Sequence, residues 1–95
     1  MRVIWTQQAQ IDYDRNIEYL LTEWSEKVAQ NFINQVSLTL QLLVINPFLY
    51  QKSDFQKTRK AFINKHITLF YIPESDRIVL LRFWNNSAPF ENLIS

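Results

Sequence analysis

Residues 59–84 read RKAFINKHITLFYIPESDRIVLLRFW, which is three runs rich in Ile, Val, Phe and Tyr separated by two polar breaks. The breaks fall at Asn64–His66 and at Pro73–Asp76. β-Branched and aromatic residues favour strands, whereas Pro, Ser and Asp favour turns. Pro73 has no N–H to donate to a neighbouring strand, which suits a strand end. The segment therefore predicts an antiparallel meander of three strands.

The last of these strands, residues 77–84, is apolar on both faces. Strict alternation places Ile78, Leu80 and Arg82 on one face and Phe83 on the other. A strand of this kind is covered on both faces, or it keeps one face for a partner. Arg82 has two interpretations. Either its stem packs while its head stays in water, or its guanidinium is aimed at a phosphate or carboxylate.

A first helix is predicted ahead of the meander, after a short strand at residues 2–5. Thr6 is a suitable N-cap, and apolar residues recur at helical spacing over 9–24. Asp12 and Asp14 lie off the apolar stripe, and we expect both on a solvated face. Trp24 at the end of the stripe is expected in the core, as are Trp5 and Trp84.

A second helix is predicted from Glu26, capped by Ser25, to Asn46. Pro47 disfavours the α conformation at Asn46 and ends the helix. One apolar face suits packing on the sheet. A second apolar stripe suits packing on the first helix or on a partner. This second stripe consists of Leu38, Leu42 and Ile45.

The predicted order β-α-α-β-β-β describes one α+β domain spanning residues 1–95. The first strand is expected beside the last strand of the meander, which gives a four-stranded, mainly antiparallel sheet. The helical hairpin should cover one face of that sheet. The other face is expected to stay partly open, bordered by the loop from Lys52 to Lys57 and by the C-terminal tail.

Composition excludes several kinds of chemistry. The chain has no cysteine, which rules out disulfides, zinc–thiolate sites and cysteine nucleophiles. Its one histidine, His66, falls in a predicted turn and argues against a transition-metal site and histidine catalysis. We therefore expect no metal and no cofactor. No N-terminal apolar region is visible, and the run 42–45 is too short to span a bilayer, so we expect a cytoplasmic protein without membrane contact.

Positive charge gathers in the second half of the chain, although the net charge is only +1. A cluster of this kind can receive nucleic acid or an acidic peptide. The cluster comprises Lys52, Lys57, Arg59, Lys60 and Lys65.

These elements, in this order, resemble the bacterial toxin superfamily that includes ParE and RelE. The paired long helices and the Asn-Pro helix end are most similar to the ParE branch. The matching features are Val3-Ile-Trp5, Ile17-Glu-Tyr-Leu20, Asn46-Pro47, Arg59-Lys60, Leu69-Phe-Tyr71 and Ile78–Trp84.

The resemblance implies a small cytoplasmic toxin that inhibits growth, serves plasmid stabilisation and forms a hetero-oligomer with a cognate antitoxin. Toxins of the ParE branch poison DNA gyrase, and those of the RelE branch cut mRNA on the ribosome. The expected antitoxin surface is the basic rim, with part of the second apolar stripe of the helix. It comprises Lys52, Lys57, Arg59, Lys60, Lys65, Arg82, Leu38 and Leu42.

Metal-independent RNA cleavage needs a base, a proton donor and cations for the developing phosphorane charge. The candidate cations are Arg59, Lys60 and Arg82. However, this chain departs from the RelE pattern at three places. Where RelE-like toxins have an arginine near the start of the strand, this chain has about Thr68. It also has no basic residue at 85–88, where a second arginine is expected, and no tyrosine after Tyr71. We therefore favour a toxin that binds a protein target. An mRNA endoribonuclease and a decayed toxin that only binds its antitoxin remain as alternatives.

Overall fold

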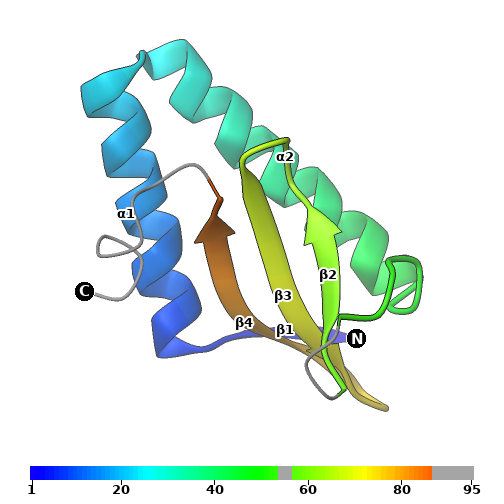
Figure 1. Ribbon diagram of the computed structural model, residues 1–95. Coiled ribbons are helices and arrows are strands. Elements are labelled where there is room, and N and C mark those ends of the chain that lie inside the picture. Colours follow the sequence, from blue (N-terminus) through cyan, green and yellow to red (C-terminus); the bar gives the residue numbers. More distant parts are fainter. Residues whose placement is uncertain (54–56, 87–95) are drawn as a thin grey trace.

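The computed structural model describes residues 1–53 and 57–86, and its elements follow the predicted order (Figure 1). They are β1 (Arg2–Trp5), α1 (Gln7–Glu23), α2 (Glu26–Ile45), β2 (Arg59–Phe62), β3 (Ile67–Pro73) and β4 (Arg77–Asn85).

The four strands form one sheet in the order β1-β4-β3-β2. β1 runs parallel to β4, and the other two neighbouring pairs are antiparallel. Figure 1 shows α2 crossing behind β2 and β3, with α1 beside β4, so that both helices lie on the same side of the sheet. The predicted α+β architecture is confirmed, including the position of the first strand next to the last.

The helix ends follow the sequence signals. The Thr6 side chain accepts a hydrogen bond from the Ala9 N–H at 3.1 Å, and the Ser25 side chain accepts one from the Val28 N–H at 3.2 Å. Asn46 leaves the helical conformation before Pro47 and ends α2. These contacts satisfy backbone groups that a helix end would otherwise leave unpaired.

The core lies between the helical hairpin and the sheet. Its centre is an aromatic cluster in which the Tyr13 ring lies 5.1 Å from Trp5, 5.5 Å from Phe32 and 5.6 Å from Phe83. This cluster joins β1, α1, α2 and β4. Its buried aliphatic neighbours are Leu20, Val36, Leu43, Ile63, Ile67, Leu69, Ile78 and Leu80.

A register shift between β3 and β4 changes which side chains of β4 face the core. Phe70 pairs with Arg82, but the next residue, Tyr71, pairs with Leu80, so that Leu81 is an extra residue in β4. One extra residue reverses the alternation beyond it. Phe83 therefore joins Leu80 in the core, and the predicted placement of Arg82 on the Leu80 face is wrong.

α1 completes the edge of β4 after β1 has ended. The Asp12 carboxylate accepts a hydrogen bond from the Phe83 N–H at 3.0 Å. The Asn16 amide donates to the Phe83 carbonyl at 3.3 Å and accepts from the Asn85 side chain at 3.1 Å. Asp12 is only 7% exposed, so its prediction as a solvated residue is wrong. The contact is tertiary, and helical spacing alone does not reveal it.

The predicted position of Trp24 at the end of the first helix also needs correction. Trp24 is 65% exposed and not a core anchor, because α1 ends before it and carries it past the packed face. Leu21 is likewise exposed.

By length and composition alone α2 would also suit a membrane span, but it packs a row of buried side chains, including Phe32 and Leu43, into the core.

Tyr71 is fully buried, and its hydroxyl donates to the Pro47 carbonyl at 3.0 Å. Burial raises the pKa of the Tyr71 phenol, and the nearby Arg59 opposes part of that rise. Tyr71→Phe should lower the free energy of unfolding by about 1 kcal/mol at neutral pH, because it removes this hydrogen bond. Urea unfolding at pH 7 measures the effect.

The same variant tests how the free energy of unfolding falls at alkaline pH, which we call the alkaline limb. An unfolded tyrosine loses its proton near pH 10, whereas buried Tyr71 keeps it to a higher pH. The stabilising effect of this proton is therefore complete below the unfolded pKa and is lost as the pH rises through the folded pKa. Tyr71→Phe should flatten the fall in stability above pH 10. An unchanged alkaline limb would contradict this assignment.

Candidate functional site

A basic cleft of about 300 Å³ lies at the start of β2. It brings together three of the predicted partner-binding cations, Lys52, Lys57 and Arg59, and is closed by Phe48, Thr58 and Pro73. Lys52 and Lys57 are exposed, so their charges are directed to solvent. This cleft is the part of the predicted basic rim that forms a concave surface.

Arg59 has a structural role within this cleft. Its Nη1 donates to the Tyr50 carbonyl at 2.9 Å, and its guanidinium lies 4.9 Å from the centre of the Phe48 ring. These contacts hold the segment after α2 against the sheet. An isolated antiparallel β-bridge between the backbones of Lys52 and Arg59 supports them. The fixed guanidinium still adds positive charge to the cleft.

The sheet face away from the helices carries cations next to aromatic rings. In one row Lys60 pairs with Phe70, which pairs with Arg82. Lys60 Nζ lies 6.0 Å from the centre of the Phe62 ring. Arg82 lies 5.2 Å from the Trp84 ring. We call this surface the open sheet face, and Phe62, which is 58% exposed, is its most accessible ring.

Arg82 is held by Asp12 across the sheet edge. Its Nε donates to Asp12 Oδ2 at 2.7 Å, and its Nη2 donates to Oδ1 at 3.2 Å. A two-point pair of this kind fixes the guanidinium plane and neutralises its charge. The guanidinium thus meets a carboxylate, as the second interpretation of Arg82 had it, and this carboxylate belongs to the chain itself.

The three candidate catalytic cations do not converge on one point. Arg59 is directed to the Tyr50 carbonyl, Lys60 lies on the open sheet face, and Arg82 is paired with Asp12. Tyr71 is fully buried. Among residues 1–53 and 57–86, no group of three or more His, Cys, Asp or Glu residues is placed to hold a metal ion.

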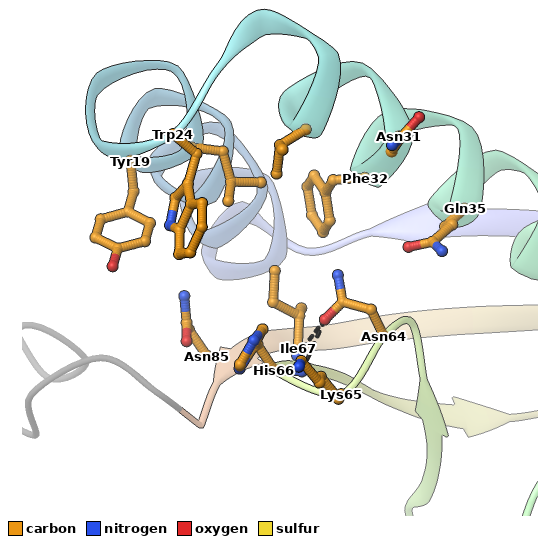
Figure 2. A pocket seen from close by; sticks show the side chains of 12 residues that line it. Tyr19, Trp24, Asn31, Phe32, Gln35, Asn64, Lys65, His66, Ile67 and Asn85 are labelled. Carbon is orange, nitrogen blue, oxygen red and sulfur yellow. Dashed lines mark hydrogen bonds between the residues drawn. The ribbon is translucent and has the colours of Figure 1, made fainter.

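Lys65 and His66 lie at the opposite end of β2, in the predicted turn before β3. There they border a second pocket, of about 330 Å³, between the turn and the helical hairpin (Figure 2). Asn64 shapes the turn by accepting a hydrogen bond from the Ile67 N–H at 2.9 Å. Figure 2 shows Trp24 and Phe32 above this turn. Hydrophobic spacing did not predict this pocket, because it placed Trp24 in the core and not on the pocket wall.

Leu38 and Leu42 belong to neither cavity. Both are exposed on α2, opposite the buried row that contains Phe32 and Leu43. The predicted partner-binding set thus divides into the basic cleft, the open sheet face, the β2–β3 turn and the outer side of α2. These are separate surfaces that one extended partner can follow, but they do not form a single small-molecule site.

Comparison with known proteins gives a family match over nearly the whole chain. The family model described as the ParE toxin of the type II toxin–antitoxin system parDE matches residues 3–89. None of the curated proteins compared matches significantly.

Solved structures of similar fold include a ParDE toxin–antitoxin system and a YoeB/ParE toxin. The chromosomal ParDE toxin–antitoxin system from P. aeruginosa aligns with a TM-score of 0.75 and 17% identity over 90% of this chain and 95% of that chain. A YoeB/ParE toxin from Agrobacterium tumefaciens aligns with a TM-score of 0.65 and 14% identity, over 90% and 98%. The E. coli DinJ–YafQ complex gives 0.57 and 17%, over 95% and 99%. At these identities the likeness concerns the fold.

Proposed function

The chain belongs to the ParE toxin family of type II toxin–antitoxin systems, and we propose that it arrests growth by binding a protein target of the gyrase type. In this proposal it acts in the bacterial cytoplasm, serves plasmid stabilisation, and is neutralised by a cognate antitoxin with which it forms a hetero-oligomer. Binding alone inhibits the target, so that the toxin needs no catalytic residue of its own.

The contact between Arg82 and Asp12 is the observation that carries this proposal. RNA cleavage through the 2′-hydroxyl requires uncompensated cations around the scissile phosphate. Here the arginine nearest the centre of the open sheet face has its charge neutralised by a buried carboxylate. Arg59 is likewise directed to a backbone carbonyl. The remaining cations suit contacts with a protein or peptide.

Inducing the chain alone in a bacterium, with genome-wide mapping of mRNA 5′ ends, tests the mechanism. We expect growth arrest without new cleavage sites, together with inhibited supercoiling when the purified chain is added to gyrase. New 5′ ends at a fixed codon position would establish a ribosome-dependent nuclease and refute the proposal. Absence of arrest would indicate a decayed toxin that only binds its antitoxin.

One observation favours the nuclease as a second candidate. The open sheet face combines Lys60 with the rings of Phe62 and Trp84, and such a surface can stack bases and contact phosphates. If RNA is the substrate, Phe62→Ala should abolish the new 5′ ends while leaving the fold intact. For a toxin that binds a protein target through other surfaces, the same variant should still arrest growth.

For the antitoxin, we propose contact with the basic cleft, because it presents exposed cations in a concave surface. A Lys52→Glu/Lys57→Glu double variant should weaken binding about tenfold at low salt, since it replaces two attractive charges with repulsive ones. The variant should also make binding less sensitive to salt. Isothermal titration at two salt concentrations measures both effects.

Lys27→Glu is the matched control, because Lys27 is an exposed lysine at the start of α2, away from the cleft. Arg59 is left intact in this experiment because it holds the Tyr50 carbonyl. If the double variant and the control bind the antitoxin equally well at every salt concentration, the cleft is not part of the interface.

A further inference from the structure

The outer side of α2, where the sequence placed part of the antitoxin surface, lies apart from the basic cleft that we propose for the antitoxin. Four exposed apolar side chains lie along it and along the turn that follows, at successive spacings of four, three and four residues. They are Leu38, Leu42, Ile45 and Leu49, which we call the α2 seam. Leu38 is 58% exposed and Ile45 is 81% exposed.

This spacing is that of the seam in a coiled coil, in which apolar residues repeat alternately every three and four positions. The same spacing continues back along α2 through two exposed amides, Gln35 and Asn31. The inner side of α2 packs on the sheet through Phe32 and Leu43. The helix therefore has two apolar sides, and among residues 1–53 and 57–86 only the inner side is covered.

The seam lies within a stretch that has no charge. No charged residue occurs between Lys27 and Lys52, although the rest of the chain carries both signs. The exposed polar side chains on this helix are amides and hydroxyls, and some pair with each other, such as Gln30 with Asn34 and Gln41 with Ser37. A solvated helix face usually carries charged residues, so this composition indicates a covered surface.

The lack of charge also limits what can cover the seam. An acidic peptide would find no cation on it, whereas the basic cleft offers several. An anionic membrane surface favours helices with lysine or arginine beside the apolar face, and none lies between residues 27 and 52. A second copy of the same surface meets neither obstacle, because a two-fold interface brings the same uncharged, apolar patch of each copy together.

We propose that the α2 seam is the interface of a homodimer, in which the α2 helices of two copies pack antiparallel about a two-fold axis near Leu42. Leu38 of one copy then lies near Ile45 of the other, and Leu42 meets its own counterpart. Uncharged flanks bring no like-charge repulsion across the axis. Amide side chains such as Gln41 both donate and accept hydrogen bonds, so they can pair with their own copies.

Sedimentation equilibrium of the full chain over about 1–100 µM, a range that brackets a micromolar dissociation constant, tests the proposal. We expect the mass of two chains at the upper end. Leu42→Glu should weaken association at least tenfold, because it places two carboxylates face to face. Leu21→Glu is the control, since Leu21 is similarly exposed but lies on α1, and it should associate like the wild type. Circular dichroism confirms that both variants fold.

Cross-linking gives an independent test, because the natural chain contains no cysteine. A Leu42→Cys variant should form a disulfide between two copies under mild oxidation, since residues on a two-fold axis approach within disulfide reach. Gln30→Cys, which is exposed on α2 outside the seam, should not.

Three results would overturn the homodimer. A wild-type chain that is monomeric throughout the range excludes it. A dimer that survives Leu42→Glu, or that Leu21→Glu weakens equally, assigns the contact to another surface. A monomeric chain whose Leu42→Glu variant loses antitoxin binding assigns the seam to the antitoxin. None of these results depends on whether the toxin acts on gyrase or on mRNA.

Discussion

Phe32→Ala should lower the free energy of unfolding by about 3–5 kcal/mol, the usual cost of removing a fully buried phenylalanine. Phe32 is 1% exposed, and its ring lies 5.5 Å from Tyr13 and 6.5 Å from Phe83. It is therefore the contribution of α2 to the aromatic cluster that joins the helical hairpin to the sheet. A small domain has little stability beyond this amount, so the variant should be largely unfolded at 37 °C.

Urea unfolding followed by circular dichroism measures this loss. Phe62→Ala is the matched control, because Phe62 is 58% exposed on the open sheet face. It should change stability by less than about 1 kcal/mol, as surface substitutions usually do. Equal destabilisation by the two substitutions would mean that the aromatic cluster does not hold α2 on the sheet.

Asp12→Ala should destabilise the fold by about 2–4 kcal/mol, because it leaves a partly buried guanidinium and a buried backbone N–H without their acceptor. The carboxylate receives hydrogen bonds from Arg82, from the Phe83 N–H and, at 2.9 Å, from the Gln8 amide. The expected cost stays below that of a fully buried ion pair, since the Arg82 side chain is 32% exposed.

Asp14→Ala is the control for this substitution. Asp14 lies on the same helix, is exposed and accepts one hydrogen bond from Gln10, so its removal should cost less than about 0.5 kcal/mol. The double variant Asp12→Ala/Arg82→Ala should lose less free energy of unfolding than the sum of the losses in the two single variants, because it removes both members of the pair. Strict additivity would show that the two side chains do not stabilise each other.

The pair between Asp12 and Arg82 also connects stability with function. If Asp12 keeps Arg82 away from phosphates, Asp12→Asn releases part of that charge onto the open sheet face while keeping an acceptor for the Phe83 N–H. Under the proposal of a protein target, we expect no nuclease activity from this variant. The buried carboxylate thus holds the Arg82 guanidinium in a pair within the chain.

Local sequence patterns determined the elements of this protein and their order. Thr6 and Ser25 mark the helix starts, Asn46-Pro47 marks the end of α2, and Pro73–Asp76 marks the last hairpin. Each of these signals acts between residues that are near in sequence, through a cap, a fixed φ angle or a turn preference. The position of β1 beside β4 was expected from the order of the elements and not from a local signal.

Only the tertiary structure decided which polar and aromatic side chains are buried. The extra residue in β4 turned Phe83 inward and Arg82 outward, and a bulge leaves no mark in hydrophobic alternation. Asp12 is buried because β1 ends at Trp5 and leaves the β4 edge to α1, a vacancy that depends on strand pairing. Trp24 is exposed because α1 ends just before it. These outcomes depend on contacts between residues up to seventy positions apart, such as Arg82 with Asp12, which no local pattern encodes.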